Sequence, residues 1–276
     1  MTSRTWFITG VNSGFGRELA SQLLERGDRV AGTVRRDGSV DDLREAYGDR
    51  LRVDSLDLTD TGRIRTVVDA VFAGLGRVDV VVSNAGYGLF GAAEEVSDEQ
   101  VAHQLATNLA GPIQLVRAAL PHLRAQGGGR IVQLSSVAGL AAHPGASLYH
   151  ASKWGIEGFL EALAGEVAPF GIGVTLVEPG GARTSFAAGS LRLGDPLAAY
   201  DATPASFVRV FRGDSAPPLP GDPAKVAARV IESVEVTPAP LRLVLGSDSY
   251  QAVTASLRAR LAQIEPQRSA ASSTDF

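Results

Sequence analysis

The sequence contains no cysteine, so disulfide bridges, thiolate nucleophiles and cysteine-bound zinc are all ruled out. Its four histidines, at positions 103, 122, 143 and 150, have none of the paired spacings of a metal site. No apolar run approaches the ~18 residues of a membrane-spanning helix. We therefore expect a protein that holds no metal ion and does not span a membrane.

Positive charge is scattered along the chain, and the net charge is −4. A surface for nucleic acid or for an anionic membrane would need a basic cluster, so we expect neither partner. The apolar N-terminal stretch is broken by Gly10 and Gly14, too early for the core of a signal peptide. These features predict a cytoplasmic protein.

Hydrophobic residues make up 45% of the chain, enough to build a large core. Short apolar runs alternate with segments of helical period, the pattern of βαβ units around a parallel sheet. We expect strands at 6–9, 29–34, 51–57, 78–83, 130–135, 172–177 and 241–245, and helices at 17–26, 41–47, 64–75, 97–123, 149–167, 223–234 and 250–264. The predicted fold is α/β, a Rossmann-type doubly wound parallel sheet of about seven strands with helices on both faces.

This rhythm fails in residues 185–222, which contain five prolines and several glycines. Such a segment is typical of an irregular insertion with short helices at most, and we interpret it as a substrate lid. Residues 267–276 are small and polar, as in a loose C-terminal tail. The sequence thus predicts a single dinucleotide-binding and catalytic domain over 1–266, with the lid inserted at about 185–222.

Residues 9–16, Thr-Gly-Val-Asn-Ser-Gly-Phe-Gly, join the first predicted strand to the first predicted helix. Gly10 allows the tight turn, Gly14 lets the backbone approach a pyrophosphate, and Gly16 lets helix and strand pack closely. The helix N-terminus then offers free N–H groups to the phosphates. A glycine-rich loop can also simply turn the chain, but its place between strand and helix favours a dinucleotide site.

The second predicted strand ends at Thr33-Val34 and is followed by Arg35 and Arg36. A site for NAD(H) usually has an acidic residue here, bound to the free ribose 2′-hydroxyl. Two guanidinium groups instead attract a 2′-phosphate, so NADP(H) is favoured over NAD(H). A solvated arginine pair is the plainer alternative, and Asp37 and Asp41 lie close enough along the chain to oppose a phosphate.

Tyr149 and Lys153 stand four residues apart at the start of a predicted long helix, hence on one face of it. A free phenol titrates near 10, and a neighbouring ammonium group favours the phenolate. We therefore expect Lys153 to lower the pKa of Tyr149 and make it a general acid/base. The same spacing also occurs by chance, as a surface pair.

Seven features together resemble the classical short-chain dehydrogenase/reductase family, in order and at the family's spacing, from residue 5 to about 184, with a continuation to about 264. They are the 9–16 turn, Asp57-Leu58, Ser83-Asn84-Ala85-Gly86, Asn108, Ser135-Ser136, Tyr149 with Lys153, and Pro179-Gly180 with Thr184. One departure is Ser83, where the family often has asparagine.

The resemblance implies a catalytic tetrad of Asn108, Ser136, Tyr149 and Lys153. Tyr149 would transfer the proton, Lys153 would lower its pKa and hold the nicotinamide ribose, and Ser136 would bind the substrate oxygen. Ser136 is preferred to Ser135 because the family places this serine thirteen residues before the tyrosine. The implied cofactor contacts are Gly10, Asn12, Ser13, Gly14, Phe15, Gly16, Arg35, Arg36, Asp57, Leu58, Asn84, Ala85, Gly86, Tyr149, Lys153, Pro179, Gly180 and Thr184.

Asn108 also has a physical argument of its own. Pro112 lies four residues later, lacks an N–H and crowds the Asn108 carbonyl. We expect a kink and a freed carbonyl that takes a water molecule, although a simple helix break fits the same residues. In the similar family, such a water links the lysine to a proton relay.

The substrate pocket should be formed by Tyr87, His143, Pro144 and Phe186, with more aromatic residues at Phe90, Tyr200, Phe207 and Phe211. These side chains favour an apolar, cyclic or bulky ketone or alcohol. The sequence therefore predicts an NADP(H)-dependent oxidoreductase of the ketoreductase or alcohol dehydrogenase kind. An epimerase or dehydratase using bound cofactor, and a non-catalytic NADP(H)-binding regulator, stay open. The predicted helices 97–123 and 149–167 carry apolar residues beyond one stripe, so a homodimer or homotetramer is expected.

Overall fold

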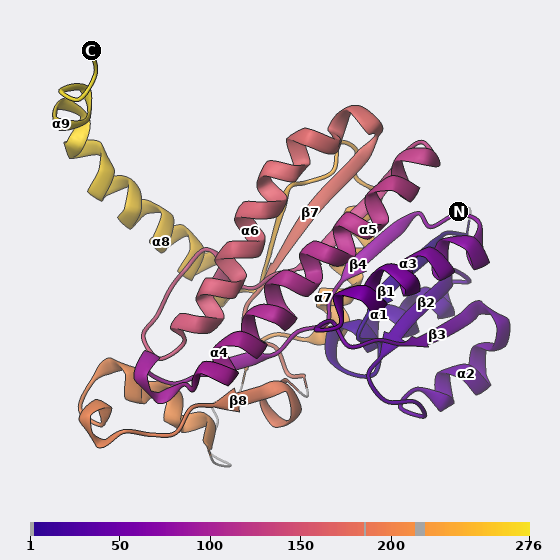
Figure 1. Ribbon diagram of the computed structural model, residues 1–276, viewed down its shortest axis with the longest axis horizontal. Coiled ribbons are helices and arrows are strands. Elements are labelled where there is room, and N and C mark those ends of the chain that lie inside the picture. Colours follow the sequence, from indigo (N-terminus) through magenta and orange to yellow (C-terminus); the bar gives the residue numbers. More distant parts are fainter. Residues whose placement is uncertain (1–2, 185, 213–218) are drawn as a thin grey trace.

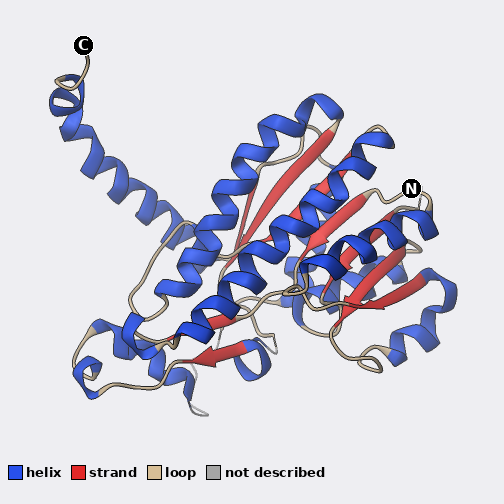
Figure 2. Cartoon of the chain, viewed as in Figure 1, coloured by secondary structure: helices blue, strands red, loops and turns tan. Residues whose placement is uncertain are grey.

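The computed structural model describes residues 3–184, 186–212 and 219–276. Its main sheet has seven parallel strands in the order β3-β2-β1-β4-β6-β7-β9 (Figures 1 and 2). The strands are β1 Thr5–Thr9, β2 Arg29–Val34, β3 Leu51–Ser55, β4 Val80–Ser83, β6 Gly129–Leu134, β7 Ile172–Pro179 and β9 Arg242–Leu245. The strand order reverses direction between β1 and β4, as in a doubly wound dinucleotide-binding fold. The predicted fold class is therefore confirmed.

Helices cover both faces of this sheet because its central strands are apolar on both sides. They are α1 Gly14–Glu25, α2 Asp41–Tyr47, α3 Thr61–Leu75, α4 Asp98–Leu105, α5 Gly111–Ala125, α6 Ser147–Val167, α7 Pro223–Glu235, α8 Ser247–Ile264 and α9 Arg268–Ser272. One buried apolar core lies between the sheet and α3, α5 and α6, and a second lies between the sheet and α1 and α7. No helix in the described part of the chain is long and apolar enough to cross a membrane.

The predicted helix over 97–123 is divided in two. A π-helical turn at Ala106–Ala110 separates α4 from α5, and Asn108 is buried in it. The break lies where Pro112 was expected to disturb the helix, since proline lacks the N–H that an α-helix needs.

Part of the 185–222 insertion forms short regular elements. They are a π-helical turn at Phe186–Ser190, strand β8 Leu191–Leu193, and 3₁₀ helices at Ala198–Tyr200 and Pro204–Arg212. Strand β8 pairs in parallel with β5 Gly88–Phe90, outside the main sheet. Residues 185 and 213–218 of the expected lid lie outside the described residues.

The C-terminal segment differs from the expected loose tail, because residues 268–272 form α9. This helix follows α8 through the 3₁₀ turn Glu265–Gln267, and the two extend away from the body of the molecule (Figure 1). Every residue from 261 to 276 is exposed. The alanines of this segment favour helix, which the sequence interpretation underestimated.

Candidate active site

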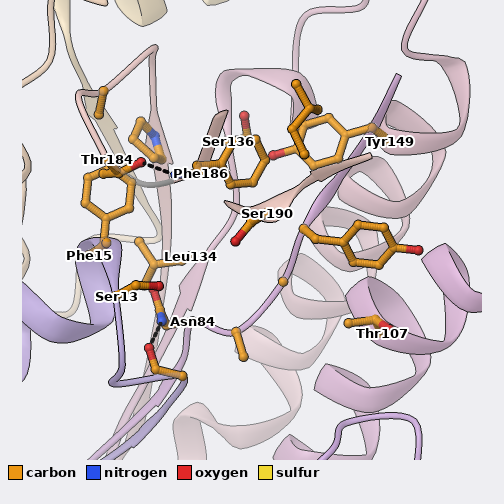
Figure 3. Close-up of a pocket in the computed structure, with 18 of the residues that line it drawn as sticks. Ser13, Phe15, Asn84, Thr107, Leu134, Ser136, Tyr149, Thr184, Phe186 and Ser190 are labelled. Carbon is orange, nitrogen blue, oxygen red and sulfur yellow. Dashed lines mark hydrogen bonds between the residues drawn. The ribbon is translucent and has the colours of Figure 1, made fainter. Parts of the chain in front are cut away.

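A cavity of about 350 Å³ opens at the carboxyl ends of the sheet strands, where doubly wound folds bind their ligands (Figure 3). Most of the expected cofactor residues line it: Gly10, Asn12, Ser13, Gly14, Phe15, Arg35, Asp57, Leu58, Asn84, Ala85, Gly86, Tyr149, Lys153, Pro179, Gly180 and Thr184. Gly16, Arg36 and Asn108 are not part of its wall. The cavity therefore joins the glycine turn to the Tyr149 end of α6.

The glycine turn needs glycine at both of its ends. Gly10 has φ +75°, in the left-handed region, and its N–H donates to the Thr33 carbonyl at 2.9 Å. A Cβ on Gly16 would collide with the Gly10 carbonyl and with the Asn84 side chain. Asn84 Nδ2 in turn donates to the Thr9 carbonyl at 2.8 Å, which holds the turn against β4.

The first turn of α1 has free backbone donors. Its N-cap residue, Ser13, makes no side-chain capping bond, so the N–H groups of the first turn point unblocked toward the cavity end of the helix. Figure 3 shows Ser13, Phe15 and Asn84 on one side of the cavity, and Ser136 and Tyr149 on another. Free donors, helix dipole and a glycine cradle together fit the diphosphate of a dinucleotide.

Positive charge is available where a ribose phosphate would lie. Arg35 lines the cavity, whereas Arg36 is exposed and does not. Two nearby carboxylates are engaged elsewhere, since Asp42 pairs with Arg17 and Asp41 lies 3.2 Å from Arg44. Among the described residues, no carboxylate lies within ion-pair distance of Arg35.

Asp57, expected at the adenine edge, lies at the same end of the cavity. Its carboxylate accepts from the N–H and the hydroxyl of Thr59, both at 2.8 Å. These hydrogen bonds, the backbone one first, lower the pKa of Asp57, and the charge of Arg35 adds to this. Asp57 is therefore ionised, and it lines the same cavity as Arg35.

Ser136, Tyr149 and Lys153 converge at the opposite end. The Ser136 hydroxyl accepts from the Ala138 N–H at 3.1 Å, and its side chain lies at the Tyr149 end of the cavity (Figure 3). Lys153 Nζ donates to the Leu134 carbonyl at 2.9 Å and lies 5.8 Å from the centre of the Tyr149 ring. All three side chains line one cavity. Leu134, whose carbonyl holds Lys153, is the last residue of β6, and Ser136 follows it by two residues.

The expected lowering of the Tyr149 pKa by Lys153 is wrong for this structure. Burial raises the pKa of Tyr149 to about 12, and the Ser136 hydrogen bond only partly opposes it. Burial also lowers the pKa of Lys153 to about 8, against the attraction of Glu157. Both side chains are shielded from water, which destabilises their charged forms. This cost exceeds the stabilisation that the two charges would give each other. Tyr149 is therefore a neutral phenol at physiological pH, the form that can donate a proton.

Asn108 acts through its side chain on the adjacent segment. Its Oδ1 accepts from the Tyr87 N–H at 3.0 Å, and its Nδ2 donates to the Tyr87 carbonyl at 2.7 Å. This pair of bonds fixes the segment after β4 that enters the cavity wall. Sequence reasoning assigned Asn108 a backbone role and missed this clamp.

The substrate end of the cavity is aromatic. Tyr87, His143 and Phe186 line it as expected, whereas Pro144 is exposed and lies outside it, a correction to the predicted pocket. Of the other aromatic residues expected in the pocket, Phe90 and Phe211 line the cavity. Phe207, which is 60% exposed, and Tyr200 do not. The Phe90 ring lies 5.8 Å from Tyr149 and 5.7 Å from Phe211.

His150 was not predicted to have a role, although it follows Tyr149 directly. Its Nδ1 donates to the Ala138 carbonyl at 2.9 Å, and its Nε2 accepts from the His143 N–H at 3.1 Å. Burial lowers the pKa of His150, so the ring is neutral and can both donate and accept. It thereby ties the loop that carries His143 to α6. Only the tertiary structure shows this.

Within the described residues, no cluster of three or more His, Asp or Glu side chains is arranged to hold a metal ion. The chemistry available is a phenol, an ammonium group and a hydroxyl, facing a cradle for a dinucleotide. A proton can thus be exchanged with a group that lies against Tyr149.

Comparisons with known proteins agree with this geometry. The model of the short chain dehydrogenase family matches residues 4–192. Oxidoreductase BOA17 of Botryotinia fuckeliana is 36% identical over 250 residues, covering 90% of this chain and 91% of that protein. Human retinol dehydrogenase 8 is 34% identical over 253 residues, covering 87% and 80%. The crystal structure of a short-chain dehydrogenase from Streptomyces avermitilis covers both chains fully, at 39% identity and a TM-score of 0.93. The chain therefore belongs to the short-chain dehydrogenase family of oxidoreductases.

Proposed function

We propose that the protein is an NADP(H)-dependent oxidoreductase that moves a hydride between the nicotinamide and a carbonyl or secondary alcohol carbon. One observation carries this proposal. The phenol of Tyr149, the ammonium group of Lys153 and the hydroxyl of Ser136 share a single cavity with the glycine turn. A dinucleotide laid from that turn would bring its reactive ring to the Tyr149 end.

The bound nicotinamide supplies or accepts the hydride, and the protein supplies the proton. In the reductive direction, neutral Tyr149 donates its proton to the substrate oxygen. Ser136 donates a hydrogen bond to the same oxygen and stabilises its developing negative charge. Lys153, anchored on the Leu134 carbonyl, stabilises the phenolate left behind. In the oxidative direction the same groups act in reverse.

Arg35 supports NADP(H) as the cofactor. It lines the cavity near the end of β2, and no described carboxylate pairs with it. The Arg17–Asp42 and Arg44–Asp41 pairs neutralise two of the acidic groups that would otherwise oppose a phosphate. A guanidinium group binds a 2′-phosphate through two parallel charge-assisted hydrogen bonds.

An apolar ketone or secondary alcohol, of cyclic or bulky form, is the proposed substrate. Phe90, Phe186 and Phe211 surround the Tyr149 end of the cavity, with His143 and Tyr87 as its polar groups. Rings at these positions favour apolar substrates and leave few groups to recognise charge. The similarity to human retinol dehydrogenase 8 supports an apolar alcohol.

The test is a screen of ketones and alcohols in which nicotinamide absorbance and product are both followed. We expect product and cofactor to change in equal amounts. Product without net cofactor change would instead indicate an epimerase or dehydratase. Cofactor binding without turnover of any compound would indicate a regulatory protein.

A further inference from the structure

Glu157 is a buried carboxyl group that the proposed chemistry does not use. It lies one helical turn after Lys153 on α6, and only 3% of it is exposed. A carboxyl group this deep in an apolar core is costly unless other groups stabilise its charge. Residues from other parts of the chain surround it: Ser135 after β6, Gly139 in the turn that follows, and Arg242 on β9.

The first group is Ser135, at the end of β6. Its hydroxyl and Oε1 of Glu157 are both buried, and neither has a hydrogen-bond partner within the described residues. Burial raises the pKa of Glu157, and the nearby Ser135 hydroxyl opposes part of that rise. Ser135 is also the residue between Leu134, whose carbonyl holds Lys153, and Ser136, whose side chain lines the cavity with Tyr149.

The second is Gly139, in the 3₁₀ turn Val137–Gly139 that follows Ser136. A Cβ at this position would lie 2.8 Å from both Glu157 Oε1 and Ser135 Oγ. Only glycine lets the turn come this close to the carboxyl group. Glu157 therefore lies against the turn that follows Ser136 and is not part of the cavity wall.

The remaining groups are charged. Arg242 of β9 approaches Glu157 at 3.3 Å, Glu178 at 3.3 Å and Glu161 at 3.0 Å. Burial, and then the charge of Glu157, raises the pKa of Glu178 to about 7. Glu178 is thus the carboxyl group of this cluster that holds a proton near neutrality. Burial also raises the pKa of Glu157, while the charges of Arg242 and Lys153 favour its carboxylate form, and that carboxylate in turn raises the pKa of Lys153.

We propose that Glu157 is a positioning residue for the active site. Its carboxylate packs beside Ser135 and Gly139, which supports the Leu134–Ser136 segment, and it keeps Lys153 in the ammonium form. The importance of this role for catalysis rests on the proposed function. The electrostatic link between Glu157 and Lys153 does not, and it can be measured without a substrate.

Lys153 and Lys225 are the only two lysines in the sequence, and Lys225 is exposed. Lys153 lines the cavity, where a small amine-reactive reagent can reach it. Acetylation with acetic anhydride at a series of pH values, followed by mass spectrometry, would give the titration curve of Lys153, with Lys225 as the internal reference. In Glu157→Gln, the midpoint of the Lys153 titration curve should lie about one pH unit lower than in the wild type. Below the midpoint, Lys153 of this variant should therefore be acetylated about tenfold faster than Lys153 of the wild type.

Glu161→Gln is the matched control, because Glu161 also contacts Arg242 but is exposed and one turn further from Lys153. It should leave the Lys153 curve unchanged, and so should Ser135→Ala, which keeps the carboxylate. If Glu157→Gln does not fold, Gly139→Ala displaces the same carboxylate and should shift the curve in the same direction by less. An unchanged Lys153 curve in both folded variants, or an equal shift in Ser135→Ala, overturns the proposal. Absence of turnover in the wild type would contradict the proposed function alone.

Discussion

Tyr149 and Lys153 are the two residues on which the proposed chemistry depends most. Tyr149→Phe keeps the ring and its contacts with Phe90 and Phe186 but removes the proton. Turnover should fall by about 10²–10⁴-fold, typical of a removed general acid/base, while NADPH affinity stays nearly unchanged. Steady-state kinetics and a binding titration measure the two effects.

Lys153→Met is the informative companion variant. It should reduce both turnover and cofactor affinity, because the ammonium group is assigned a role in each. The double variant should lose less than the sum of the two effects, since both residues serve one proton transfer. Near wild-type turnover in folded Tyr149→Phe would remove this tyrosine from the mechanism.

Arg35 should decide the choice of cofactor. NADPH should bind about 10- to 100-fold more tightly than NADH, since charge-assisted hydrogen bonds contribute about 1.5–3 kcal/mol. Arg35→Ala should remove most of this preference, whereas Arg36→Ala, outside the cavity wall, should keep it. Equal dissociation constants of the wild type for both cofactors would contradict the assignment.

The raised pKa of Glu178 predicts how the free energy of unfolding depends on pH. Its pKa in the folded protein, about 7, is above its ordinary value of 4.5. Its contribution to the free energy of unfolding is therefore complete below about pH 4.5 and is lost as the pH rises through about 7. Glu178→Gln does not titrate, so its stability relative to the wild type should rise between pH 5 and pH 8, by about 3 kcal/mol at most. Urea unfolding at both pH values tests this, with Glu161→Gln expected to follow the wild type.

The sequence predicted the positions of Tyr149, Lys153 and the glycine turn well, because their spacing along one helix or one turn determines their geometry. It did not predict Glu157, His150 or the exposure of Pro144. These depend on which face of a helix or loop meets a distant segment, and no local pattern carries that information. Only the four-residue step from Lys153 to Glu157 could have indicated a partner in advance.

Among the secondary structure elements, continuous apolar runs gave the main strands to within about two residues. The three-residue strands β5 and β8 were not predicted, since so short a segment shows no periodicity. Their pairing joins the insertion to the segment after Gly86, which forms part of the cavity wall. The C-terminal helix α9 was missed because small polar residues fit a tail as well as a helix.

Glu95 also holds the insertion to the body, in addition to the β5–β8 pairing. This buried carboxylate accepts from the Leu197 N–H at 2.9 Å and from Arg209 at 2.7 Å. Few other side-chain contacts of this strength tie the described part of the insertion, so we expect it to open locally before the main sheet does. Limited proteolysis should cut within 185–222 first, and cofactor with substrate should protect it. Glu95→Gln should speed the cutting; an insertion that resists while the main sheet is cut would contradict a lid.

At the scale of the whole molecule, the outer faces of α5 and α6 are where we expect subunits to meet. Trp154 is 40% exposed, and Leu109 and Phe159 are only partly buried. Gly158, on the outer side of α6, has no atom within 4 Å of where a Cβ would lie. A face that combines apolar side chains with an open glycine allows a second helix to approach closely.

We therefore expect a homodimer or homotetramer in which α5 and α6 meet their counterparts in another subunit. Gly158→Arg would place a long charged side chain in that contact and should shift the protein toward monomer, because an unpaired buried charge destabilises an interface. Ala46→Arg, on the exposed side of α2, adds the same charge elsewhere and should leave the assembly unchanged. Light scattering coupled to size exclusion measures both variants against the wild type. If the wild type is monomeric at micromolar concentration, the assembly is refuted; if both variants keep its mass, the interface lies on another face.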